Sequence, residues 1–390
     1  MKILMVNMVC GIKSTGRICT DLAQLLETKG HQCLIAYGRE HAPAQYKKYA
    51  FRFGNKLSLK HDSVFTKLFD NAGFNSNIAT GRLIKKIKEF NPDIIHLHNL
   101  HGWYAHVGRL FRFLKEYGKP VVWTLHDCWS FTGHCAHFTA AGCDKWKEGC
   151  HHCAQHNAYP PAILADCSKI NYRKKKALFT NLEHMTIVTP SKWLADLVKQ
   201  SFLKDYPVKV VHNGIDVSVF KPEDSDIREK YSIQNKKVIL GVASSWNEQK
   251  GLADFLELSK MLDDSYAIVL VGLSSQQIAE LPSNVIGIAR TNSTMELAQI
   301  YTASDVFANL TYEDTYPTVN LEAQACGTPV ITYRTGGSVE SVPAENIVEQ
   351  GDLEGLVEKL EKDDLSVSTQ NFDKQVLFEQ YIELYERLKN

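Results

Sequence analysis

The sequence predicts an α/β protein with two doubly wound domains that face each other across a cleft. The first observation is that short apolar strands alternate with helical patterns, which is typical of βαβ units and a parallel sheet. The second is that this alternation restarts near residue 236. The third is the length of 390 residues, enough for two ordinary domains. Such sheets bind ligands at the carboxyl ends of their strands, so the cleft is the expected site.

The first series of strands and helices occupies the N-terminal half of the chain. Its expected strands are at 2–9, 33–38, 93–99 and 121–127, with two more that begin at 186 and 208. A glycine loop from Gly11 to Gly16 follows the first strand, and the apolar spacing of 17–28 predicts a helix that Gly30 ends. Residues 41–80 and 128–156 lack the pattern and are interpreted as insertions.

The second series predicts a smaller domain. Its expected strands are at 236–244, 267–272, 285–289, 305–310 and 329–333. The segment from Asp216 to Lys236, which contains Pro222, is the predicted linker. A long helix at about 372–390 is expected to return to the first domain. The predicted domains are therefore 1–218, with the insertion 128–156 and this last helix, and 219–371.

Composition excludes several classes of protein. Apolar residues make up 44% and charged residues 23%, as in a soluble globular protein. Zero net charge argues against a nucleic-acid-binding protein that relies on a basic surface. No stretch approaches the ~20 apolar residues of a membrane span. The start, MKILMVNMVC, is interrupted by Asn7 and is interpreted as a buried strand and not as a signal peptide. A cytoplasmic location with reduced cysteines is expected.

The segment TYEDTYPTVNLEAQACGTPVI, residues 311–331, predicts a ligand site. Pro317 suits the first position of a helix and Gly327 the left-handed position after its end. The amides expected to bind an anion at this helix start are those near Thr318, Val319 and Asn320. Glu322 would repel a phosphate, but it can accept two hydrogen bonds from a ribose diol. The segment therefore predicts a nucleoside diphosphate site; the alternative is a surface glutamate on a core helix.

The spacing of eight positions between Asp314 and Glu322 resembles the paired-acid motif of the retaining family 4 glycosyltransferases, which have the GT-B fold of two Rossmann-like domains. Six further motifs follow the order of that family: GIKSTGR (11–17), TLHD (124–127), TPSKW (189–193), HNGIDVSVF (212–220), EQKG (248–251) and TGGSVE (335–340). The resemblance covers nearly the whole chain. It is to the bacterial members that build capsule, exopolysaccharide or lipopolysaccharide chains, including the colanic-acid type.

The resemblance implies roles for several residues in the second domain. Glu322 would hold the ribose of the donor, and Asp314 would lie by the transferred sugar, where the family usually has glutamate. Lys250 would face the donor diphosphate and neutralise the charge that grows on it. Where the family commonly has an arginine, this chain has Ser245, which is placed in the phosphate site. Gly337 would permit close approach of the backbone.

In the first domain the resemblance assigns His126 to a strand end near the donor sugar; the alternative is a buried structural histidine. The loop that contains Gly16 and Arg17 would approach the diphosphate or the acceptor. Arg17 or Arg290 is a candidate to replace the arginine that is absent at position 245. Lys13 stands where a glycine is expected, so the loop is predicted to be less tight than usual.

The implied function is transfer of a sugar, with retention, from a UDP- or GDP-linked donor to a glycan or polyprenyl-diphosphate-linked acceptor, without a catalytic metal. One alternative is a catalytically weak GT-B pseudoenzyme or binding scaffold, since position 245 lacks the arginine and position 314 the glutamate. A dinucleotide-dependent oxidoreductase is disfavoured because CGIKSTGR lacks the pattern G-x-G-x-x-G. A zinc-containing nucleic-acid or protein-binding module is disfavoured by the neutral net charge.

The segment 126–156 is rich in cysteine and histidine, and 150–153 reads CxxC. Four thiolates close in sequence suit a tetrahedral structural zinc site. The expected ligands are Cys135, Cys143, Cys150 and Cys153, with His134, His151 or His152 as alternates. The alternative is a set of free thiols or a disulfide.

Two basic stretches contain interleaved apolar residues: RLIKKIKEF (82–90) and YRKKKALF (172–179). A basic amphipathic surface can dock on anionic lipid, so peripheral contact with the inner face of a membrane is one hypothesis. The alternative is that each stretch is the solvated face of an ordinary helix.

Overall fold

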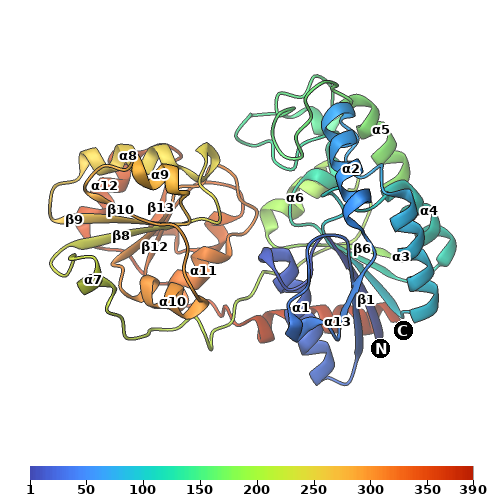
Figure 1. Cartoon of the computed structure of the whole chain (residues 1–390), viewed down its shortest axis with the longest axis horizontal. Helices are drawn as coiled ribbons and strands as arrows, with labels where there is room; N and C mark the ends of the chain where they lie inside the picture. The colour runs from blue at the N-terminus through green and yellow to red at the C-terminus, as the bar shows by residue number, and fades with distance from the viewer. Residues whose placement is uncertain (390) are drawn as a thin grey trace. The chain divides into compact units, whose positions relative to one another are not determined.

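The computed structural model describes residues 1–389, which form two α/β units (Figure 1). The first unit consists of Met1–His212 and the C-terminal residues from Phe378, and the second is Asn213–Leu377. Each unit has its own parallel sheet, which confirms the predicted fold class. The chain leaves the first unit at His212, before the predicted boundary at residue 218.

The first unit holds a seven-stranded parallel sheet in the order β3-β2-β1-β4-β5-β6-β7. Its strands are β1 (Lys2–Asn7), β2 (Gln32–Tyr37), β3 (Ala50–Arg52), β4 (Ile94–Leu97), β5 (Val121–Thr124), β6 (Met185–Thr189) and β7 (Val208–Val210). The strand order reverses between β1 and β4. The carboxyl ends at such a reversal are the usual ligand site of a doubly wound sheet.

Within residues 1–389, seven α-helices accompany this sheet. They are α1 (Lys13–Thr28), α2 (Lys56–Phe69), α3 (Asn77–Phe90), α4 (Val107–Tyr117), α5 (Ser168–Phe179), α6 (Lys192–Gln200) and α13 (Lys374–Lys389), the last of which begins in the second unit. Helix α1 begins four positions before the predicted Arg17, so Gly16 lies in its first turn. Helix α2 lies within 41–80, where the sequence predicts an insertion without the apolar periodicity of a helix.

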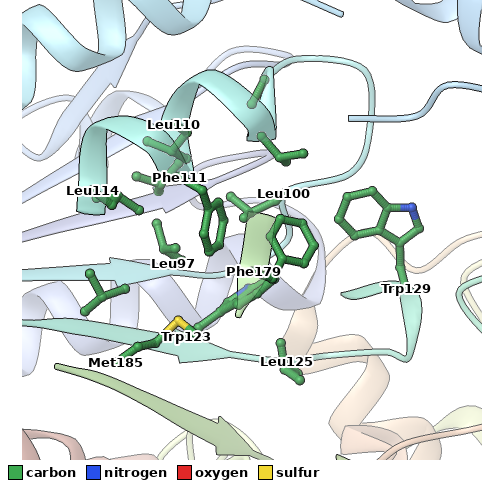
Figure 2. Close-up of a cluster of buried hydrophobic side chains, with 14 of the residues drawn as sticks. Leu97, Leu100, Leu110, Phe111, Leu114, Trp123, Leu125, Trp129, Phe179 and Met185 are labelled. Atoms are coloured by element: carbon green, nitrogen blue, oxygen red, sulfur yellow. The ribbon is translucent and has the colours of Figure 1, made fainter. Parts of the chain in front are cut away.

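The core of the first unit is built between β4, β5 and the helices that cover them. Figure 2 shows Phe111 of α4 and Phe179 of α5 over Leu97 and Trp123 of the strands. The ring centroids of Phe111 and Phe179 lie 4.5 Å apart, and those of Trp123 and Phe179 lie 5.0 Å apart in an edge-to-face arrangement. Every residue of these two strands is buried, as is usual when helices cover both faces of a parallel sheet.

The second unit holds a six-stranded parallel sheet in the order β10-β9-β8-β11-β12-β13. Its strands are β8 (Lys237–Val242), β9 (Tyr266–Val271), β10 (Val285–Ile288), β11 (Val306–Asn309), β12 (Val330–Tyr333) and β13 (Ile347–Val348). Its helices are α7 (Ile227–Lys230), α8 (Leu252–Met261), α9 (Ser275–Ala279), α10 (Thr294–Thr302), α11 (Thr318–Ala325) and α12 (Leu353–Lys362). The strand order reverses between β8 and β11, so the loops after these strands frame the expected site.

Helix α13 completes the core of the first unit with two buried tyrosines. The Tyr385 hydroxyl lies 2.6 Å from Nδ1 of His96, and the Tyr381 hydroxyl lies 3.2 Å from Oγ1 of Thr124. His96 Nε2 lies 2.7 Å from the same Thr124 oxygen. The C-terminal residues are therefore hydrogen-bonded to β4 and β5, far from them in sequence. Each helix of residues 1–389 is too short or too polar to cross a membrane.

Candidate functional site

The start of α11 forms the centre of the candidate site in the second unit. Pro317 is the residue before the first helical position, with φ −72° and ψ 118°, and Gly327 adopts φ +85° after the helix end. The amides of Thr318 and Val319 belong to the first turn and have no acceptor within the helix. The amide of Asn320 donates to the Pro317 carbonyl at 3.3 Å. Thr318 and Val319 thus provide the amides best suited to bind an anion.

Glu322 lies one turn further along α11 and is only 8% exposed. The Tyr301 hydroxyl of α10 donates to Glu322 Oε2 at 3.1 Å. A buried carboxylate is costly unless it is hydrogen-bonded, so its place here calls for polar partners. Glu322 is therefore not the surface residue of the alternative interpretation.

Asn320 is fully buried, and its side chain holds the site together instead of facing a ligand. Its Oδ1 accepts from Asn309 at 2.7 Å, and its Nδ2 donates to Ser338 and Ser341 at 3.2 and 3.0 Å. These bonds link α11 to β11 and to the turn after β12. Sequence reasoning grouped Asn320 with the anion-binding residues, but only its backbone lies in the helix start.

Lys250 and Asp314, in the segments that follow β8 and β11 of the six-stranded sheet, form an ion pair. The distance between Lys250 Nζ and Asp314 Oδ2 is 3.0 Å, and Nζ also lies 3.4 Å from Thr311 Oγ1. The amide of Gly337 donates to the Asp314 carbonyl at 3.2 Å. Gly251, with φ +72°, lets the turn after Lys250 pass so close to β11 that a Cβ would lie 2.2 Å from the Leu310 carbonyl. The structure thus brings together three residues that the sequence selected from distant motifs.

Two other predicted residues lie at the surface of the second unit. Ser245 is exposed in the loop after β8, and its neighbour Trp246 is buried with Nε1 donating to the Val271 carbonyl at 2.9 Å. Arg290 is exposed just after β10. The buried Trp246 fixes the backbone next to position 245. The serine at this position provides no guanidinium for a phosphate.

In the first unit His126 follows the end of β5 by two residues and contacts a second histidine. Its Nε2 lies 3.0 Å from Nδ1 of His98, which follows β4. Burial lowers the pKa of His126 to about 4, so its imidazole is neutral at physiological pH. The sequence HLHN at the end of β4 was the available signal for His98. It was overlooked because β4 and β5 were considered separately.

A second pair of side chains, which the sequence analysis did not predict, lines the same pocket as His98 and His126. His101 Nε2 is 2.7 Å from Asp127 Oδ2, and His101 Nδ1 is 3.2 Å from the Tyr159 hydroxyl. Burial acts to raise the pKa of Asp127, but the charge and hydrogen bond of His101 hold it at about 2. A pocket at the ends of β4 and β5 is lined by His98, His101, His126 and Asp127. The carboxyl edge of this sheet therefore carries a polar cluster.

The glycine loop after β1 is a tight turn. The Gly11 amide donates to the Gly16 carbonyl at 3.0 Å, and a Cβ on Gly16 would lie 3.0 Å from Val9 Cγ2. Lys13 adopts the left-handed φ of +56° where a glycine was expected, and its Nζ pairs with Glu40 at 2.9 Å. Arg17 is exposed. Gly16 thus has a packing role, and Arg17 is accessible to a ligand.

Comparison with known proteins identifies the family. Residues 15–219, more than half of the chain, match the model described as Glycosyltransferase Family 4. The chain belongs to this family. Residues 223–366 match a second model, described as Glycosyl transferases group 1. The family-level resemblance inferred from the motifs is confirmed.

Relatives of this glycosyltransferase include proteins of surface-polysaccharide pathways. It is 25% identical over 353 residues to the colanic acid biosynthesis glycosyl transferase WcaC of Escherichia coli (strain K12), which spans 87% of this chain and 85% of WcaC. It is 26% identical over 167 residues to the capsular polysaccharide biosynthesis glycosyltransferase CapM of Staphylococcus aureus, spanning 38% of this chain and 43% of CapM.

Solved structures give the same fold. HepE of Anabaena in complex with UDP has a TM-score of 0.68 at 17% identity, over 99% of this chain and 100% of HepE. WaaG, a glycosyltransferase involved in lipopolysaccharide biosynthesis, has a TM-score of 0.59 at 16% identity, over 98% of this chain and 95% of WaaG. At these identities the likeness shows the fold, which is GT-B with two Rossmann-like units.

The cysteine-rich segment of this glycosyltransferase packs against the core of the first unit. Cys135 is buried and Cys143, Cys150 and Cys153 are half-buried; all four are free thiols. Cys135 and Cys153 are hydrogen-bonded to each other, and the Gly133 amide donates to Cys150 Sγ at 3.1 Å. Burial raises the pKa of Cys150 to about 11.

The predicted zinc site is not supported. No group of three or more His, Cys, Asp or Glu side chains within residues 1–389 is arranged to hold a metal ion. Among the alternates, His134 is instead paired through Nδ1 with the Asp70 carboxylate. Cys135 and Cys153 are hydrogen-bonded to each other and Cys150 to the backbone, and all four cysteines are free, as in the free-thiol alternative.

The two basic stretches belong to helices whose apolar residues serve the core. In α3, Leu83 and Ile87 are fully buried, while Lys85 lies 3.9 Å from Glu89 at the surface. In α5, Lys175 is itself buried: its Nζ donates to the Trp129 carbonyl at 2.7 Å and lies 3.5 Å from the centre of the Trp129 ring. The other basic residues of α5, Arg173, Lys174 and Lys176, are exposed.

The buried ammonium of Lys175 predicts a pH-dependent stability. Burial lowers its pKa to about 7 in the folded state, below the ordinary value near 10.5. The unfolded chain therefore binds more protons between these values, and stability rises with pH from about 7 to 10.5. Between pH 7 and pH 9 the free energy of unfolding of the wild type is expected to gain about 2 kcal/mol relative to Lys175→Met. Denaturant titrations of both proteins at the two pH values measure this difference. An equal change in the free energy of unfolding of the two proteins between pH 7 and pH 9 would contradict it.

Proposed function

We propose that this glycosyltransferase moves a sugar, with retention at the anomeric carbon, from a UDP- or GDP-linked donor to a glycan or polyprenyl-diphosphate-linked acceptor in cell-surface polysaccharide biosynthesis. The observation that carries the proposal is the grouping of Lys250, Asp314 and Glu322 around the carboxyl ends of β8 and β11 and the start of α11. The second unit would bind the nucleotide sugar and the first unit the acceptor.

The donor would be held by complementary charge and hydrogen bonding. The amides of Thr318 and Val319 suit the diphosphate because the helix start carries partial positive charge. Glu322 would accept hydrogen bonds from the ribose diol. Lys250 would exchange part of its contact with Asp314 for a phosphate oxygen, which leaves Asp314 beside the sugar.

Transfer breaks the bond between the anomeric carbon and the diphosphate oxygen and forms a bond to an acceptor hydroxyl. Negative charge grows on the leaving diphosphate, and the Lys250 ammonium and the helix amides stabilise it, so no catalytic metal is expected. A phosphate oxygen takes the proton of the acceptor hydroxyl. The neutral imidazole of His126 suits a hydrogen bond to a sugar hydroxyl.

The names of relatives support the choice of donor and pathway. HepE is described in complex with UDP, and WcaC and CapM by colanic acid and capsular polysaccharide biosynthesis. Acceptors of such pathways are often lipid-linked, which favours a cytoplasmic protein with peripheral contact at the inner membrane face.

The test is binding and hydrolysis of a panel of nucleotide sugars, with UDP, GDP, ADP and NAD as controls. We expect one nucleoside diphosphate and its sugar conjugate to bind and the sugar to be released slowly. Glu322→Gln is expected to weaken that binding by about 10- to 100-fold, because it removes charge-assisted hydrogen bonds to the ribose. Glu280→Gln, at the exposed end of α9, is the matched control. Binding of NAD alone would refute the proposal.

One observation favours a second candidate, a GT-B pseudoenzyme or binding scaffold. Position 245, where the family commonly has an arginine, is an exposed serine. A weaker phosphate site would bind the nucleotide but transfer slowly. Nucleotide binding without sugar release from any donor, with and without glycan acceptors, would support this candidate over the transferase.

A further inference from the structure

Three side chains at the carboxyl edge of the first sheet lie together outside every motif named above. Arg39 follows the end of β2 by two residues, Trp103 lies in the loop after β4, and Tyr159 precedes α5. The guanidinium carbon of Arg39 lies over the Trp103 ring, 5.0 Å from its centroid. The ring centroids of Trp103 and Tyr159 lie 6.2 Å apart in an edge-to-face arrangement. We name these three residues the Arg39 site.

Trp103 is held in a backbone conformation that large side chains rarely adopt. Its φ is +66°, and the preceding Gly102 has a φ of +108°. A Cβ on Gly102 would lie 2.3 Å from Met8 Sδ, so the loop after β4 passes directly against the residue that follows β1. Positive φ at a bulky residue costs free energy and persists only where the surrounding structure imposes it, often at ligand sites. The indole Nε1 is buried without a hydrogen-bond partner, so no hydrogen bond of the indole explains this placement.

Arg39 leaves most of its hydrogen-bonding capacity unused. Its Nη1 lies 3.5 Å from the Gly102 carbonyl and 4.0 Å from Met8 Sδ, and its other N–H groups contact no acceptor within residues 1–389. The carboxylates of Glu40 and Asp127 are paired with other side chains. The Arg39 side chain is only half-buried, so a ligand can reach it. A guanidinium with free N–H groups is suited to bind an oxyanion through two parallel hydrogen bonds.

Tyr159 connects the Arg39 site to the polar cluster at the ends of β4 and β5. The residue is 42% exposed, while its hydroxyl lies 3.2 Å from Nδ1 of His101. Burial raises the pKa of Tyr159 to about 12, so the hydroxyl stays protonated at physiological pH. The hydroxyl is thus fixed toward the protein, and the exposed part of the ring is available to a sugar. His101 lines the same pocket as His126, which places such a sugar near the histidine assigned to the donor.

We propose that the Arg39 site binds the acceptor through an oxyanion carried by one of its sugars, a carboxylate or a phosphate. Arg39 holds the oxyanion, Trp103 supports the guanidinium, and the Tyr159 ring packs on the sugar. The inference rests on the proposed function, because it gives the acceptor of that transfer a chemical class and a place in the first unit. A neutral sugar gains the ring contact but not the charge-assisted hydrogen bonds, so the site distinguishes acidic from neutral acceptors.

The test is saturation-transfer NMR titration of the full chain with methyl glucoside, methyl glucuronide and glucose 6-phosphate. UDP and GDP are both present in excess, so that these ligands cannot occupy the donor site. At least one acidic ligand is expected to bind about tenfold more tightly than the glucoside. Preference for the glucuronide identifies a carboxylate, and preference for the phosphate identifies a phosphate ester. Equal affinity for all of them, or no binding of any, would overturn the proposal.

The variants separate charge from ring contact. Arg39→Ala is expected to weaken the acidic ligand by about 10- to 100-fold and to change glucoside binding by less than about threefold. Arg39→Lys keeps the charge without the planar fork and is expected to lose less. Tyr159→Ala is expected to weaken acidic and neutral ligands alike. Arg82→Ala, which removes an exposed arginine of α3, is the matched control and is expected to keep the wild-type preference.

An unchanged preference for the acidic ligand in Arg39→Ala would also overturn the proposal. Circular dichroism of every variant reports on the fold, and nucleotide binding reports on the donor site. If nucleotide sugars bind and release sugar but no acidic preference is found, this inference fails and the proposed function stands. If the preference depends on Arg39 but no nucleotide sugar binds, the proposed function fails and the Arg39 site remains a binding site for acidic sugars.

Discussion

Lys250→Ala is expected to lower kcat/KM for sugar transfer by about 10²- to 10³-fold, the magnitude usual for loss of one group that stabilises transition-state charge. The ammonium lies 3.0 Å from Asp314, so its removal also leaves a carboxylate unneutralised beside the diphosphate. The side chain is 37% exposed, so the fold should tolerate the change. Steady-state rates with the donor that the nucleotide-sugar panel identifies measure the effect.

Lys260→Ala is the control for Lys250→Ala. Lys260 is an exposed lysine of α8 that pairs with Glu257 at 2.7 Å, and surface pairs of this kind contribute little. Its rate is expected to remain within about twofold of the wild type. If Lys250→Ala binds the donor and transfers sugar as fast as the control, Lys250 is not the residue that neutralises the leaving group.

Tyr385→Ala is expected to destabilise the first unit by about 3–5 kcal/mol, the usual cost of removing a large buried ring. Tyr385 is fully buried, and its hydroxyl contacts His96 Nδ1 at 2.6 Å. Burial lowers the pKa of His96 to about 3, so its neutral ring has one donor and one acceptor nitrogen. The Tyr385 hydroxyl is the hydrogen-bond partner of Nδ1, and the Thr124 hydroxyl is the partner of Nε2.

Tyr385→Phe separates packing from hydrogen bonding. It keeps the ring but leaves His96 Nδ1 unpaired, so a loss of about 1–3 kcal/mol is expected. Glu386→Ala, on the exposed side of α13, is expected to change stability by less than about 0.5 kcal/mol. Chemical denaturation followed by tryptophan fluorescence of the first unit measures all three. Equal stability of Tyr385→Ala and the wild type would show that α13 is not part of this core.

Local patterns were sufficient for most of the sheets and for part of the site. Strands β1, β8 and β9 are continuous apolar runs, and Gly30 and Gly327 mark helix ends through their left-handed backbone. The edge strands β3 and β13 were missed because they have only three and two residues. Helix α2 was missed because its buried side is polar, so the usual apolar periodicity toward a core is absent.

The sequence by itself determined the α/β class, the two series and the motif of Asp314 and Glu322, because strand alternation, helix ends and a fixed spacing are properties of neighbouring residues. Only the tertiary structure decided that Lys250 pairs with Asp314, that His98 meets His126, and that Tyr385 contacts His96. Each of these contacts joins residues that lie far apart in the sequence. Their proximity depends on strand order and on the path of α13, which no local pattern encodes.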